Sequence, residues 1–184
     1  MAQPLSIRVA QHGGNSVLKF IGWLSALSGI VAAFLIVLAV AITCQMIFVR
    51  FVLNDSTIWQ TEMVVYLMIA ATMLGLPYVQ LLRGHVNVEL LPMMLPMGLR
   101  KVLAVVTLSV AIAVIGAMLF YGYSMWHEAW SRGWRSDTVW GVKLWLPYLA
   151  IPVGFGLYLL QLIADLAALL FGYEKPFQLD EGGN

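Results

Sequence analysis

The sequence predicts an all-α integral membrane protein with four transmembrane helices, and three observations carry this prediction. Hydrophobic residues make up 61% of the 184-residue chain and charged residues only 10%, whereas a soluble domain carries about 25% charged residues. The mean hydropathy is +0.88. Four apolar runs lack Asp, Glu, Lys, Arg and His, and each reaches the roughly 20 residues that a membrane-spanning helix needs. They are Phe20–Val49, Met63–Leu82, Val102–Trp126 and Leu144–Ala164.

The polar residues that border these runs set the limits of the predicted membrane domain. It covers residues 16–172, between an N-terminal tail of residues 1–15 and a C-terminal tail of residues 173–184. A secretory signal has an apolar region of about 7–15 residues, and the first run is about twice as long. We therefore expect a retained first helix that is tilted or extends beyond the hydrocarbon. The predicted spans cover about 20–49, 59–82, 102–126 and 144–170.

The distribution of Lys and Arg predicts that both tails lie in the cytoplasm. Four spans place the two tails on one side of the membrane, together with the second connection. Six basic residues lie on that side and four on the other, and an excess of Lys and Arg marks the cytoplasmic side. The tail side has Arg8, Lys19, Arg83, Arg100, Lys101 and Lys175; the outer side has Arg50, Arg132, Arg135 and Lys143.

The first connection contains residues that are typical of a helix start. Asp55, Ser56 or Thr57 can cap the second span, and Glu62 follows in its first turns, where the helix dipole favours a carboxylate. Glu62 permits two interpretations. It either relays protons or binds cations inside a transporter, or it is a capping or interfacial acid that can form a salt bridge to a partner protein. The second interpretation is favoured.

The connection between the second and third spans predicts an interfacial segment over residues 86–101. This segment is too apolar for a solvated loop, and Pro92 and Pro96 interrupt it too often for a span. We expect it to lie on the cytoplasmic membrane surface, with Arg100 and Lys101 toward the lipid headgroups. Docking to another membrane subunit is an alternative use of the same segment.

Tryptophan recurs every fourth residue after the third span, at Trp126, Trp130 and Trp134. Residues at this spacing share one face of a helix. The row predicts either a ligand-stacking site or an aromatic belt at the membrane interface, where Trp is enriched. The belt is favoured, and it implies a third helix that extends beyond the hydrocarbon on the outer side.

Motifs for catalysis and cofactor binding are missing from the sequence. His12, His85 and His127 lie outside the apolar runs, so no pair of them is placed to ligate an intramembrane haem. His127-Glu128 begins like a zinc-protease motif, but Ser131 stands in the place of the second histidine. We therefore expect no enzyme, no cofactor and no metal site. The net charge of +1 gives no reason to expect a nucleic-acid partner.

The apolar runs also give little support to a permeation route. Transporters and channels mark their pathways with intramembrane charges, broken helices or repeated halves, and these runs carry no charge. Pro77 and Pro152 can kink their spans, but each lies near an end. Small residues at four-residue spacing favour close helix packing, and they are Ser25, Gly29, Ala33, Ala71, Gly75, Ala113 and Ala117. This pattern favours a scaffold over a carrier.

Two stretches resemble a known family. Residues Glu62–Gly75 begin with an acid and end in a Leu-Gly pair, and Arg83-Gly84-His85, a hydrophobic residue and Glu89 follow. The Pro-containing stretch Leu144–Gly154 begins the fourth span. Both are similar to the small membrane subunit of tripartite ATP-independent periplasmic (TRAP) transporters, the DctQ-like proteins. Glu89 stands where an aspartate is often found in that family. The resemblance covers roughly residues 16–172.

The resemblance implies two protein partners. One is a large membrane subunit of many spans that carries substrate and sodium, and the other is a soluble periplasmic binding protein that delivers an organic acid. This chain would scaffold and anchor the large subunit in the bacterial inner membrane, in contact with membrane lipid. Uptake would be driven by an ion gradient without ATP.

The resemblance and the topology together suggest roles for the charged residues at both faces. Arg83, His85 and Glu89 would pair with one another, hold the interfacial segment or bind the large subunit. Candidates for subunit contact or for the membrane interface are Glu62, Arg83, His85, Glu89, Arg100 and Lys101. Candidates for docking the periplasmic binding protein are Arg50, Asp55, Arg132 and Arg135.

Other interpretations remain open. The chain can be a free-standing four-helix membrane scaffold, a self-assembling channel or a small membrane enzyme. The small subunit of tricarboxylate tripartite transporters also has four spans and a related role. The Arg-Gly-His element at residues 83–85 favours the TRAP family.

Overall fold

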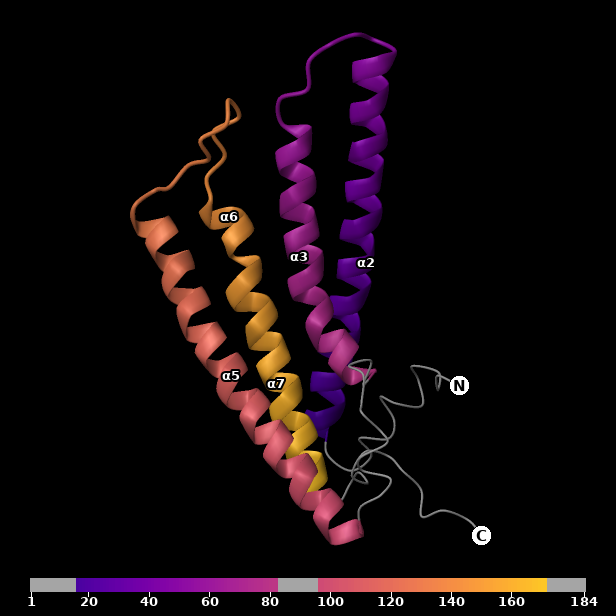
Figure 1. Ribbon diagram of the computed structural model, residues 1–184, viewed down its shortest axis with the longest axis vertical. Coiled ribbons are helices and arrows are strands. Elements are labelled where there is room, and N and C mark those ends of the chain that lie inside the picture. The colour runs from indigo at the N-terminus through magenta and orange to yellow at the C-terminus, as the bar shows by residue number, and fades with distance from the viewer. Residues whose placement is uncertain (1–15, 83–95, 172–184) are drawn as a thin grey trace.

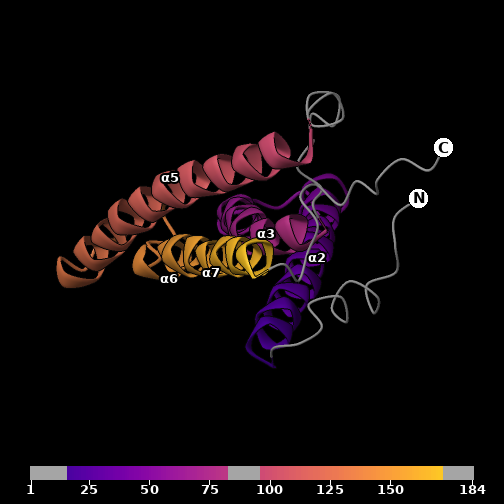
Figure 2. The same cartoon turned by 90° about the horizontal axis from the view of Figure 1, so that it is seen from below.

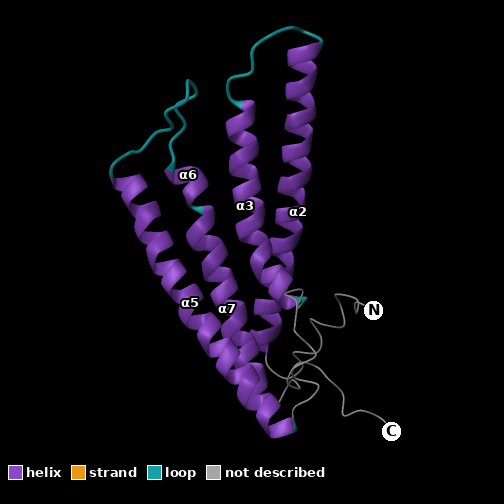
Figure 3. Ribbon diagram, in the orientation of Figure 1, coloured by secondary structure: helices purple, strands orange, loops and turns teal. Residues whose placement is uncertain are grey.

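The computed structural model describes residues 16–82 and 96–171, and all regular elements in these ranges are helices (Figure 3). The predicted all-α fold is confirmed. Four helical segments are long and apolar enough to cross a membrane. The elements are α2 (Ser16–Phe51), α3 (Gln60–Leu81), α5 (Met97–Ser131), α6 (Trp145–Tyr148) and α7 (Ala150–Leu170).

Two of the helices are much longer than the hydrocarbon requires. α2 has 36 residues and α5 has 35, so each spans about 50 Å at 1.5 Å per residue, against about 30 Å of hydrocarbon. They therefore tilt or extend into the interface. α5 begins at Met97, so residues 97–101 of the predicted interfacial segment form its first turns. Residues 86–95 of that segment lie outside the described residues.

The fourth span is divided into α6 and α7, which meet at Leu149. The hydrogen bond from the Val153 amide to the Leu149 carbonyl, 3.3 Å long, continues the helical path across this point. Pro152 lies in the first turn of α7. The backbone N–H groups of a first turn have no partner within their own helix, so proline, which lacks this N–H, is tolerated there. Pro77 lies inside α3, which continues past it to Leu81.

The helices alternate in direction, so the described segments have two distinct ends (Figure 1). The connections 52–59 and 132–144 share one end, which we call the loop end. Ser16, Leu81, Met97 and Leu170 share the other, which we call the tail end. α3 packs on α2 and on α7, and α7 packs in turn on α5. Figure 2 shows the same order from below, with α3 and α7 between α2 and α5.

Small side chains form most of the buried core. This is expected in a membrane, where the hydrophobic effect does not drive helices together and they associate by close packing. The ring of Tyr78 lies against Gly29, and the backbone of Met73 lies against Gly154. Of the small residues singled out by their spacing, Ser25, Gly29 and Ala71 are buried. Ala33, Ala113 and Ala117 are exposed. The most buried alanines are Ala39, Ala129, Ala164 and Ala168.

Large apolar side chains cover the outer surfaces of α2 and α5. Such a surface on a soluble protein would aggregate or mark an interface, whereas in a bilayer it faces acyl chains or another membrane protein. On α5 these residues include a row at four-residue spacing, Val102, Val106, Val110, Val114 and Met118.

The close approach of α7 to α3 makes Gly154 intolerant of a side chain. A Cβ there would lie 2.6 Å from the Met73 carbonyl oxygen, and backbone cannot move aside cheaply. We expect Gly154→Ala to destabilise the protein by about 1–3 kcal/mol, seen as a lower apparent Tm in mild detergent. Gly116→Ala is the matched control, because a Cβ at Gly116 has nothing within 4 Å. Equal effects of the two substitutions would contradict the packing described.

Candidate functional site

A short hairpin connects α5 to α6 at the loop end. α5 ends in a Schellman motif: the Trp134 amide bonds the Ala129 carbonyl at 3.0 Å, and the Gly133 amide bonds the Trp130 carbonyl at 3.1 Å. Gly133 has φ +62°, the left-handed conformation that this motif requires. The chain then doubles back through bonds from Ser136 to Val142 (2.9 Å) and from Leu144 to Trp134 (3.0 Å).

Glu62 fastens this hairpin to α3. Its carboxylate lies in the first turn of α3 and accepts hydrogen bonds from the hydroxyls of Tyr66 and Thr138. The Ser136 and Thr138 hydroxyls are 3.0 Å apart. Beside them the rings of Trp59 and Trp140 meet with their centroids 6.2 Å apart. The predicted interfacial acid therefore joins α3 to the connection 132–144 of its own chain, and its contact with a partner stays a prediction.

The predicted cap of the second span is wrong. α3 begins at Gln60 after Trp59, and no side chain caps its first amides. The Asp55 carboxylate instead accepts a bond from the neighbouring Ser56 amide at 2.7 Å. Thr57 accepts a bond from the Arg50 Nε at 2.8 Å. These short-range bonds order the connection 52–59 and tie it to the last turn of α2.

The hairpin presents basic side chains to solvent. Arg135 and Lys143 face each other as a bridge pair, and the hydrogen bonds on either side make it a non-hydrogen-bonded pair, with Cα atoms about 4.5 Å apart. Like charges at such a position destabilise a pairing. Arg132 forms a salt bridge to Glu128 at 3.1 Å. Residues 132–144 carry a net charge of +2, so the hairpin is suited to an acidic partner.

Two further predicted site residues among the described ones lie away from this cluster. Arg100 and Lys101 lie in the first turns of α5, at the tail end. Arg83, His85 and Glu89 lie outside the described residues, so their roles stay predictions.

The tryptophan row is shorter on the helix than predicted. α5 ends at Ser131, so Trp134 belongs to the hairpin and does not share a helix face with Trp126 and Trp130. The physical reason is Gly133, whose left-handed conformation terminates the helix. Trp130 instead contacts Trp126, with centroids 5.1 Å apart, and Trp145, at 5.2 Å. The extension of α5 past the apolar run agrees with the prediction.

A second polar cluster lies inside the bundle, at residues for which the sequence predicted no site. The Ser25 hydroxyl on α2 donates to the Gln161 side-chain oxygen on α7 at 2.7 Å. The Gln161 amide donates to one oxygen of Asp165 at 2.8 Å, and the Gln80 amide on α3 donates to the other at 2.7 Å. Gln161 is fully buried and Asp165 is 5% exposed. The network therefore connects three helices.

Asp165 corrects the expectation of charge-free membrane cores. The uncharged run stops at Ala164, one residue before Asp165, but the predicted span over 144–170 includes this acid, and α7 continues to Leu170 and buries it. A signal was present in the sequence, because a Gln and an Asp four residues apart lie on the same helix face and can bond each other. An ionisable residue inside a membrane helix has a partner or a function by default. Here two amides from different helices are among its partners.

The polar side chains offer little for metal chemistry. Within residues 16–82 and 96–171, no group of three or more His, Cys, Asp and Glu side chains is placed to hold a metal ion. Both acids described above accept hydrogen bonds from neutral hydroxyls or amides. Such bonds position helices and connections.

Comparison with protein families gives one match. The family described as "Tripartite ATP-independent periplasmic transporters, DctQ component" matches residues 39–172. The match covers part of α2, all of the other described helices and both connections at the loop end. No curated protein matches the chain.

The buried network predicts a specific loss of stability. Gln161→Met keeps a side chain of similar length but removes two hydrogen bonds and leaves Asp165 with one donor fewer. Interhelical hydrogen bonds in membranes contribute about 0.6 kcal/mol on average and up to about 1.7. We expect a loss of about 1–2 kcal/mol in unfolding measured in mild detergent. Leu160→Met, at a neighbouring exposed position, is the control and should cause little change; a wild-type stability of Gln161→Met would contradict the network.

Proposed function

This chain belongs to the DctQ component family of TRAP transporters, and we propose that it scaffolds and anchors the large membrane subunit during uptake of an organic acid. The family match over residues 39–172 carries this proposal. DctQ proteins are small permease subunits of ATP-independent transporters, so the chain is a transport component and a membrane protein. Sodium coupling and the bacterial inner membrane, with both tails cytoplasmic, are parts of the proposal.

The packing of the helices supports a stationary role. The side-chain network of Asp165 and the close contacts at Gly29 and Gly154 hold α2, α3 and α7 together. Such packing resists sliding, because interdigitated small residues have few alternative registers. Glu62 and Asp165 each bond to neutral groups of the same chain. This arrangement favours a structural role for the two acids over a proton or cation relay.

The exposed apolar surfaces of α2 and α5 support a large membrane partner. α5 packs mainly on α7 and leaves Val110, Val114 and Phe120 at least half exposed. A partner with many spans would cover part of this surface, and lipid would cover the rest. A family whose members work within three-part transporters provides such a partner.

The basic hairpin supports docking of the periplasmic binding protein at the loop end. The pairing of Arg135 with Lys143 is unfavourable in the isolated chain. An acidic surface on the partner would relieve this repulsion and would speed association by electrostatic steering. Because Glu62 and Trp59 fix the hairpin against α3, the charges are presented at a defined place.

Co-purification tests the assignment directly. The tagged chain, isolated from its native membranes in mild detergent, should carry a large multi-span protein in roughly stoichiometric amount. Mass spectrometry identifies the partner. A chain recovered alone, or only with copies of itself, would overturn the proposed function and favour a free-standing scaffold or a channel.

Charge reversal tests the docking surface. In the complex held in lipid nanodiscs, Arg135→Glu together with Lys143→Glu should weaken binding of the periplasmic binding protein by about ten-fold or more at low salt. The difference should shrink at high salt, where exposed charges are screened. Lys101→Glu, at the opposite end, is the control and should bind normally. Wild-type binding by the hairpin variant would remove the hairpin from the interface.

A further inference from the structure

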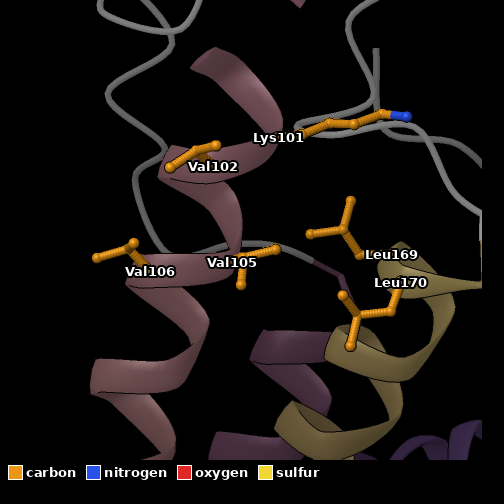
Figure 4. A pocket seen from close by; sticks show the side chains of 6 residues that line it. All are labelled: Lys101, Val102, Val105, Val106, Leu169 and Leu170. Atoms are coloured by element: carbon orange, nitrogen blue, oxygen red, sulfur yellow. The ribbon is translucent and has the colours of Figure 1, made fainter. Parts of the chain in front are cut away.

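A surface cavity lies between α5 and α7 at the tail end. Its volume is about 310 Å³. Five of its six lining residues are aliphatic, and the sixth is a lysine (Figure 4). The lining residues are Lys101, Val102, Val105 and Val106 of α5 and Leu169 and Leu170 of α7.

The position of this cavity along the helices places it at a membrane boundary. Lys101 is the last charged residue before the apolar run that starts at Val102. Leu170 is the final residue of α7. The cavity therefore extends from the level of the headgroups into the outer part of the hydrocarbon.

The charged and the aliphatic side chains of the cavity follow the same order, from headgroup level to hydrocarbon. The side chain of Lys101 extends from α5 toward the α7 side and lies above Val105, Leu169 and Leu170, whereas Val102 and Val106 lie on the other side of the α5 ribbon (Figure 4). Lys101 is exposed, so its ammonium group can meet a ligand at the surface. Val102 is 62% exposed and Leu170 is 65% exposed, which opens the aliphatic wall to the surroundings.

We propose that this cavity binds one anionic phospholipid of the tail-side leaflet. The phosphate pairs with the Lys101 ammonium, and an acyl chain lies along Val105, Val106 and Leu169. Basic pockets between membrane helices recognise anionic headgroups in this way. The inference rests on the membrane-spanning fold and does not require the transport function proposed above.

The open side of the cavity favours an acyl chain as its occupant. Val102 and Leu170 leave the aliphatic wall exposed, and in a bilayer such a wall meets the acyl chains of lipids. A flexible chain can follow this wall between α5 and α7. α5 packs on α7, and Ala104 of α5 and Ala168 of α7 are buried, so the wall of the cavity is formed before a lipid arrives.

Native mass spectrometry of the full-length chain in mild detergent tests the proposal. The protein is titrated with phosphatidylglycerol and, separately, with phosphatidylethanolamine of the same acyl chains. We expect preferential binding of phosphatidylglycerol and an affinity about five-fold lower for Lys101→Gln, the loss typical of one basic residue at an anionic membrane surface. Val105→Phe, which fills the cavity, should reduce binding of both lipids.

Arg135→Gln is the matched control, because it removes one positive charge from the loop end. It should bind phosphatidylglycerol as the wild type does. Equal affinity for the two lipids, or unchanged binding by Lys101→Gln, would overturn the proposal. Loss of the lipid when the chain is isolated with a large membrane partner would also overturn it, since the cavity would then belong to a protein interface.

Discussion

The hydrogen bonds that Asp165 accepts from Gln80 and Gln161 are the constraint on which the arrangement of the helices depends. A carboxylate inside a membrane helix is costly unless polar groups surround it. Gln161 lies on the same helix as Asp165, so α3 must keep the register that brings the Gln80 amide to the carboxylate. Ser25 adds α2 through its bond to Gln161. Apolar side chains alone would not favour one register of the helices over another, because they pack against acyl chains of the bilayer about as favourably as against a neighbouring helix.

This constraint gives the two ends of the molecule different properties. Near the tail end, the network and the small buried residues hold α2, α3 and α7 together, and α5 joins them through α7. At the loop end Glu62 holds the hairpin 132–144 to α3, and Trp59 of the connection 52–59 contacts Trp140 of the hairpin. A rigid frame that carries a charged hairpin outside the membrane suits an accessory subunit that positions larger partners.

The sequence predicted the four spans well because a run of apolar residues needs no tertiary information to be recognised. It placed Glu62 correctly near the start of α3, but it could not show that Thr138, far along the chain, would bond to it. The end of α5 was missed because four-residue Trp spacing continued past Gly133, which terminates the helix. Asp165 lies inside the predicted fourth span but beyond its uncharged run, and the sequence could not show that side-chain amides of α3 and α7 would both bond to it.

If this chain is a stationary scaffold, the distances between its helices stay constant during transport. Spin labels at the exposed positions Leu27 on α2 and Ile163 on α7 report that distance by pulsed electron paramagnetic resonance in the isolated complex, with and without sodium and substrate. A scaffold predicts a distance that stays constant to within about 2 Å, the scale of small helix shifts. A change of about 5 Å or more, one helical turn, would show that this chain moves with the substrate and would contradict the scaffold role.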